Sequence, residues 1–157
     1  MAAPSITVVN DLDQTVANWD AGTVQANNDS AILTLLIWNN RGGQTALSDL
    51  KECTITSLDI DGGSSSDVVS GKWVNVNVPS IDGNQTTWTQ VGGATTKSLR
   101  ADGVQAQDGF IIKGTTNDGN KNNSRPNYCT ARLKVHVPLN ATAGTKTYKL
   151  RINGYYV

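Results

Sequence analysis

Residues 129–137, CTARLKVHV, alternate strictly between apolar and polar side chains. Cys129, Ala131, Leu133, Val135 and Val137 share one parity, and Thr, Arg, Lys and His residues occupy the positions between them. Because successive side chains of a β-strand point to opposite faces, this pattern predicts a strand with one face in a core and the other facing out. This stretch therefore places the chain among proteins built from half-buried strands.

The next residues continue the pattern after a break. Pro138 ends the first strand because it lacks a backbone donor, and Gly144 marks a turn. A second alternating run follows, with Tyr148, Leu150 and Ile152 on one face. Since only residues 138–145 join the two runs, we expect them to pair as an antiparallel hairpin with a long loop.

Upstream runs predict further strands. AILTLLIW (31–38) is apolar on both parities, which indicates a central strand covered on both faces, with a partner subunit as one candidate cover. In WVNVNVP (73–79), the three valines should face inward, and Trp73 should face outward with the two asparagines. SITVV, ITSLDI and GFIIKG also read as strands, as do TTWTQV and ATTKSLRA, and only TALSDLKE (45–52) suggests a helical turn.

The fold class follows from these runs and from the composition. Thr, Asn, Gly, Ser and Val are abundant, charged residues make up only 17% of the chain, and turn-like stretches separate the strands. We therefore predict an all-β protein with one antiparallel β-sandwich domain and long loops. Residues 1–30 would form an N-terminal arm and the first strand, and residues 31–157 the sandwich.

The charge balance excludes some classes of function. Thirteen basic and thirteen acidic side chains cancel, so we expect neither duplex nucleic acid nor a membrane surface as partner. The N-terminal residues lack a basic segment followed by an apolar one, so we expect synthesis in a cytoplasm without a signal peptide or membrane anchor. In reducing conditions, Cys53 and Cys129 should be buried thiols rather than a disulfide.

The inventory of reactive side chains is poor. The single histidine, His136, lies on an outward strand position, and we find neither a nucleophile elbow nor a phosphate-binding loop. We therefore expect no enzyme and no cofactor. Asp59, Asp61 and Asp67 form the one weak metal candidate, for calcium, but their spacing departs from the EF-hand loop, so we expect a turn and no metal.

Aromatic and Asn-rich residues are the candidates for partner contact. An outward Trp73 or Trp88 would suit a protein interface, with burial under a loop and stacking on a sugar ring as the alternatives. The longest loop, residues 115–127, is rich in Asn, and we expect it to be mobile or to touch a partner. We expect its exposed residues Asn122, Asn123 and Arg125 to contact a partner.

Two segments resemble a known family. VPLNATAGTKTYKLRI (137–152) resembles the final hairpin of bacterial and phage immunoglobulin-like domains, through Val137, Pro138, Ala141, Gly144, Tyr148, Leu150 and Ile152. LTLLIWNNRGGQTALSDLKECTITSLDI (33–60) is similar to the second-strand region of such domains. The resemblance implies an Ig-like sandwich.

Combined with the missing signal peptide, the resemblance indicates a structural protein of a tailed-bacteriophage virion. We expect a capsid decoration or tail-associated subunit that binds other virion proteins and copies of itself. The alternative is a carbohydrate-binding or adhesion module of a cell-surface protein, with a host-surface glycan as its ligand.

Overall fold

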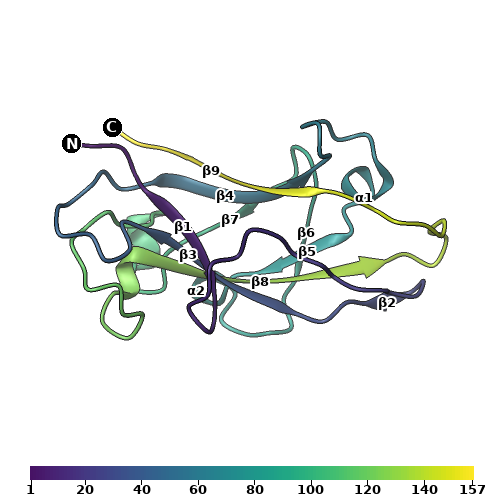
Figure 1. Ribbon diagram of the computed structural model, residues 1–157, viewed down its shortest axis with the longest axis horizontal. Helices are drawn as coiled ribbons and strands as arrows, with labels where there is room; N and C mark the ends of the chain where they lie inside the picture. Colours follow the sequence, from purple (N-terminus) through teal and green to yellow (C-terminus); the bar gives the residue numbers. More distant parts are fainter.

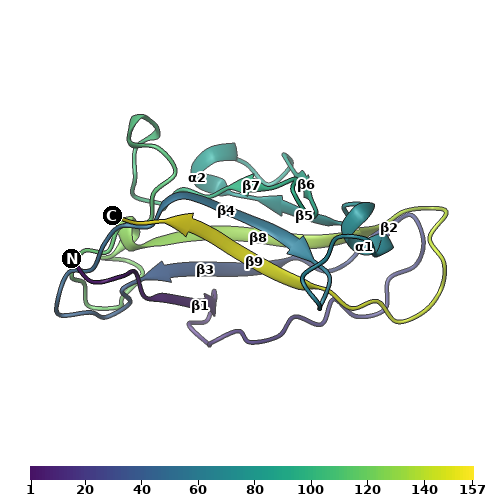
Figure 2. The same cartoon turned by 90° about the horizontal axis from the view of Figure 1, so that it is seen from above.

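The computed structural model describes all of residues 1–157 as two antiparallel β-sheets with a few short helices. The larger sheet has the strand order β1 (Ile6–Asn10), β3 (Leu33–Asn39), β8 (Tyr128–Val137), β5 (Val74–Asn77) and β6 (Thr89–Val91), and β2 (Asn28–Asp29) pairs with the end of β8. The smaller sheet has the order β7 (Lys97–Ser98), β4 (Lys51–Leu58) and β9 (Lys149–Tyr155). Figure 1 shows the sheets as two layers, and Figure 2 shows the same layers from above. The all-β prediction is confirmed.

The main core lies between the sheets and contains the inward residues that the alternation predicts. On β8, Cys129, Ala131 and Leu133 are fully buried, and they meet Cys53 and Ile55 of β4 in one apolar cluster. Both cysteines are free and buried, which confirms the prediction of unbonded thiols. Burial raises the pKa of the Cys53 thiol to about 12 and that of the Cys129 thiol well above its usual value.

β3 is buried on both faces, as its apolar run predicts. Leu35 and Ile37 join the main core, whereas Leu36 and Trp38 join a second cluster on the outer face of the larger sheet. The chain itself supplies the cover on that face. The Arg41 guanidinium lies 5.6 Å from the centre of the Trp38 ring. The Tyr128 hydroxyl, beside Trp38, donates a hydrogen bond of 2.9 Å to a carbonyl of the 115–127 loop. A partner subunit is therefore not needed to cover β3.

The predicted hairpin of the last two strands is wrong. β8 belongs to the larger sheet, whereas β9 pairs with β4 in the smaller one, with Ile152 opposite Ile55. Residues 138–148 cross between the layers instead of folding one strand back on its neighbour. Pro138 and Gly144 mark where a strand breaks, but such local signals do not determine the strand with which the next one pairs.

Two smaller expectations also differ from the structure. Residues 45–52 form no helical turn, and the short helices are instead α1 (Asp67–Ser70), α2 (Pro79–Asp82), η1 (Ala106–Asp108) and η2 (Arg125–Asn127). The stretch GFIIKG contributes only a single bridge, between Ile112 and Leu50. Both segments are held by contacts with distant parts of the chain, which local patterns do not report.

Buried asparagine side chains hold the loops at one end of the molecule. The Asn39 amide accepts a hydrogen bond from the Ser5 N–H (3.0 Å) and donates to the carbonyls of Ser48 (2.9 Å) and Ile112 (3.2 Å). Asn40 and Asn127 likewise donate to carbonyls of the segment from Lys113 to Thr115. Irregular segments lack the regular backbone hydrogen bonds of a β-sheet. The amide side chains therefore supply hydrogen-bond partners for the backbone carbonyl groups of these loops.

Candidate functional site

The outer face of the larger sheet carries a row of basic side chains along β8. Arg132, Lys134 and His136 occupy the outward positions of the alternation and are half-buried. The Arg132 guanidinium donates to the Asn77 amide oxygen of β5 at 3.2 Å. We call Arg132, Lys134 and His136, together with Asp29 and Trp88, the β8 outer-face cluster.

Asp29 of β2 lies beside this row of basic side chains. Its Cα lies opposite that of His136 in the pairing of β2 with β8. One carboxylate oxygen lies 2.7 Å from Lys134 Nζ, and the other lies 2.6 Å from His136 Nδ1. Hydrogen bonds first from Lys134 and then from His136 hold the pKa of the Asp29 carboxyl below its usual value. The Asp29 carboxylate therefore remains ionised around neutral pH.

Trp88 forms the aromatic part of the cluster. Lys134 Nζ lies 4.4 Å from the centre of its ring, a cation–π distance. Its indole N–H donates to the Gln85 carbonyl at 2.9 Å, which orients the ring just before β6. The ring is half-buried, so part of its surface remains available for contact. The arrangement suits noncovalent recognition, because it combines an oriented aromatic surface with basic side chains.

Trp73 does not lie on this outer face, and the outward placement predicted for it is wrong. Only 6% of its surface is exposed, and its ring belongs to the main core cluster. It stands one residue before β5, after Lys72 with a φ of 53°, so the alternation of the strand does not govern its direction. Asn75 and Asn77 are buried as well, and the Asn77 amide donates to carbonyls of Asn84 and Thr87 in the segment between α2 and β6.

A cleft of about 660 Å³ opens at the Trp73 end of the molecule. Its walls are two irregular segments, residues 20–26 and 141–148. Trp73 and Val135 contribute apolar surface, and Asp20, Thr142 and Lys146 contribute polar groups. Sequence patterns offered no signal for this cleft, because it is formed where two distant irregular segments meet.

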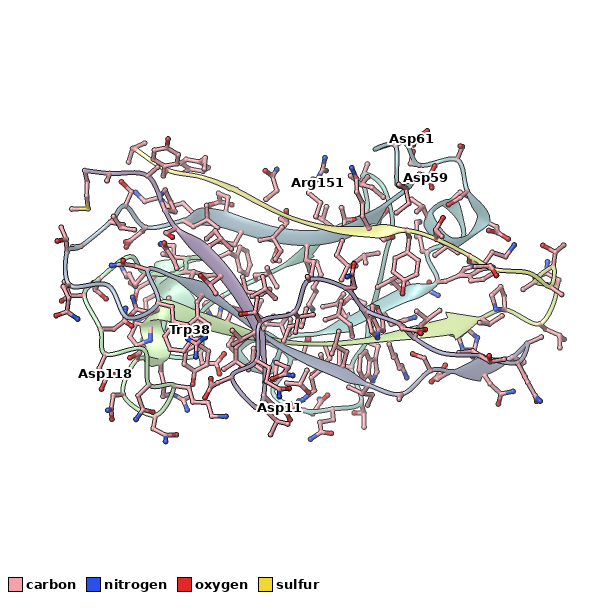
Figure 3. All side chains as sticks on the ribbon, viewed as in Figure 1. Asp11, Trp38, Asp59, Asp61, Asp118 and Arg151 are labelled. Atoms are coloured by element: carbon pink, nitrogen blue, oxygen red, sulfur yellow. The ribbon has the colours of Figure 1, made fainter.

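The three predicted loop residues lie at the opposite end of β8 from Trp73. Asn122, Asn123 and Arg125 are exposed, as expected. They belong to the loop that precedes β8, whereas Trp73 lies beside the far end of that strand, near Val135. Figure 3 shows Asp118 of this loop at one end of the molecule. Asp59, in the segment that leads through α1 to Trp73, lies at the other end. The predicted contact residues therefore do not form one continuous site.

Internal bonds hold the loop in one conformation. The Asn123 amide donates to the Asp118 carboxylate at 2.9 Å, and this bond lowers the pKa of Asp118. The Asn117 amide donates to the Asn40 carbonyl at 2.7 Å. The loop thus presents its exposed residues from a hydrogen-bonded frame.

Asp59, Asp61 and Asp67, the candidate calcium ligands, do not form a metal site. No group of three His, Cys, Asp or Glu side chains in the chain is arranged to hold a metal ion. Asp59 instead accepts hydrogen bonds from Ser66 and Ser65, which lower its pKa. Asp61 accepts from the Gly63 N–H at 2.9 Å, and Asp67 pairs with Lys146 at 2.8 Å. The stretch is a turn stabilised by its own carboxylates, as Asp-Gly sequences commonly are.

Sequence reasoning found some members of the β8 outer-face cluster and missed others. The alternation of CTARLKVHV places Lys134 and His136 outward, and the sequence also suggests Trp88 as an exposed aromatic residue. Asp29 was missed, because β2 has only two residues and no pattern of its own. A charge opposite a basic strand face is visible only once the pairing of β2 with β8 is known.

Comparisons with known proteins add no relatives. No protein family, no curated protein sequence and no solved structure matches this chain. None of its helices is long and apolar enough to span a bilayer.

Proposed function

We propose that this chain is a non-enzymatic structural protein of a tailed-bacteriophage virion, built on an Ig-like sandwich. It would act as a capsid decoration or tail-associated subunit that binds neighbouring virion proteins and copies of itself. The observation that carries the proposal is the β8 outer-face cluster, in which Lys134 lies over the half-exposed Trp88 ring. Tryptophan and basic side chains held in fixed positions are enriched among the residues that dominate protein interfaces.

Two further features support the proposal. The long loops are tied to the body by buried amides, so the exposed residues Asn122, Asn123 and Arg125 are presented on a fixed frame, which reduces the entropy lost on binding. The two-sheet architecture agrees with an Ig-like sandwich at the level of fold class. The separation of β8 from β9 means that the resemblance of residues 137–152 rests on their sequence and not on a shared hairpin.

Binding to purified particles tests this function. The labelled chain is mixed with particles lacking it, and the bound fraction is measured after sedimentation. Trp88→Ala should weaken attachment at least about tenfold, as expected for a central aromatic contact. Gln90→Ala is the matched control, since Gln90 is exposed on β6 and its side chain makes no hydrogen bond. A chain that is absent from particles and does not attach to them would refute the proposal.

A carbohydrate-binding or adhesion module is the second candidate, favoured by the cleft beside Trp73. That cleft combines an aromatic edge with the polar groups of Asp20 and Thr142. Sugar recognition uses such combinations of ring surface and hydrogen-bonding groups. A glycan array separates the candidates: specific glycan binding that survives Trp88→Ala and is lost when Thr142 is replaced by a bulky residue would favour this function.

A further inference from the structure

β9 is a seven-residue strand at the open edge of the smaller sheet. It pairs with β4 on one side only, and Figure 2 shows no strand of the same sheet on its other side. The chain covers the corresponding edge of β1, where Val9 bridges Thr15 and the Val16 N–H donates to the Val8 carbonyl at 3.1 Å. The backbone groups along the free edge of β9 thus remain available to pair with another strand.

An apolar groove of about 360 Å³ lies beneath the inner face of this edge. Leu150 and Ile152 of β9 line this groove together with Val16 and Trp19. Core residues such as Leu35 lie at its bottom. An extended segment paired to β9 would direct every second side chain toward this groove, because side chains alternate across a strand. Apolar side chains at those positions would be removed from water.

The outer face of β9 has the opposite character. Lys149 and Arg151 are exposed and two residues apart on one face, and Figure 3 shows Arg151 pointing away from the two layers. Neither forms an ion pair within the chain. The carboxylates of the nearby Asp59 and Asp61 accept hydrogen bonds from backbone N–H groups of their own turn. β9 therefore presents two unpaired cations beside its free edge.

The charges of Lys149 and Arg151 determine which kind of strand can pair with the free edge of β9. A second copy of β9 would bring another Lys149 and Arg151 onto the same face, and like charges on neighbouring strands destabilise a sheet. Basic residues on an edge are a common means of preventing self-pairing. A strand with acidic residues facing outward would instead place opposite charges side by side.

We infer that the free edge of β9 binds an extended segment of a partner protein in which acidic and apolar residues alternate. The segment adds a fourth strand to the smaller sheet, with its carboxylates beside Lys149 and Arg151 and its apolar side chains in the groove. The inference rests on the proposed function in one respect, namely that the chain works by binding another protein. It adds the place of contact and the chemistry of the bound segment.

A pair of capped peptides tests the inference. The chain is titrated with Glu-Val-Glu-Val-Glu-Val and separately with Lys-Val-Lys-Val-Lys-Val, and backbone amide NMR shifts are followed. We expect the acidic peptide to shift the amides of β9 and the basic peptide to leave them unchanged. The double variant Lys149→Glu/Arg151→Glu should weaken the acidic peptide at least about fivefold, from the loss of two cross-strand charge pairs. It should also gain binding of the basic peptide, an effect that simple loss of structure would not produce.

Controls make each outcome decisive. Lys72→Glu reverses a charge outside β9 on a side chain without an ion pair, and it should leave peptide binding unchanged. Equal binding of both peptides, shifts away from β9, or no binding would overturn the inference. A dimer that sediments as such and that the double variant dissociates would also overturn it, in favour of self-pairing.

Particle attachment separates this inference from the proposed function. If the double variant attaches to particles as well as the unaltered chain does, the β9 inference fails while the proposed function stands. If the unaltered chain does not attach at all, the proposed function fails, and the peptide titration still decides whether β9 accepts a strand.

Discussion

Replacing Asn39 by alanine should strongly destabilise the protein, because its side chain joins three backbone groups that are far apart in the chain. Its side chain is fully buried and makes three hydrogen bonds, to the N–H of Ser5 and the carbonyls of Ser48 and Ile112. The Asn39→Ala variant leaves three backbone groups without these partners. At about 1 kcal/mol for each net hydrogen bond, the free energy of unfolding should fall by about 3 kcal/mol. The melting temperature should then fall by roughly 6–12 °C for a chain of this size.

Urea denaturation measured by far-UV circular dichroism gives this free energy directly. Asn122→Ala is the control, because Asn122 is exposed and its side chain makes no hydrogen bond, and it should change stability by less than about 0.5 kcal/mol. Asn39→Asp keeps the acceptor for Ser5 but loses both donors and buries a carboxylate, so it should be at least as destabilising. A loss below about 1 kcal/mol for Asn39→Ala would refute the idea that this amide holds the loops.

Other predictions concern the core and the ionised groups. Cys53 and Cys129 should not react with a thiol reagent near neutral pH until the chain unfolds, because burial raises the pKa of both thiols; rapid labelling of the folded chain would contradict this. The pKa of Asp29 is lowered in the folded state, so its ionised form contributes stability that is present above about pH 4 and is lost as the pH falls through the folded pKa. Thermal melts of Asp29→Asn should therefore show a weaker loss of stability on acidification than those of the unaltered chain, and parallel profiles would argue against the contribution of its ion pairs. Leu133→Ala should lower the free energy of unfolding by about 2–5 kcal/mol because the residue is fully buried. Leu139→Ala, at a position that is 77% exposed, should have almost no effect in the same denaturation experiment.

The candidate site was predictable only where a regular strand carried it. The alternation along β8 placed Lys134 and His136 outward correctly, because a strand fixes side-chain direction over many residues. The same reasoning failed at Trp73, which lies just beyond the end of a strand and turns into the core. It also missed Asp29, whose short strand β2 acquires its meaning only by pairing with β8.

The sequence by itself determined that the chain forms strands, which of their faces are apolar and where most of them end. Alternation on β8 and the two-sided apolar run of β3 are local properties, and they report directly on burial. Only the tertiary structure decided which strands pair, because pairing depends on contacts between residues far apart in the chain. It assigned β8 and β9 to opposite sheets, joined the 115–127 loop to the Tyr128 hydroxyl and left one edge of β9 free. Each of these outcomes depends on how whole strands and loops pack together, which no single stretch of sequence encodes.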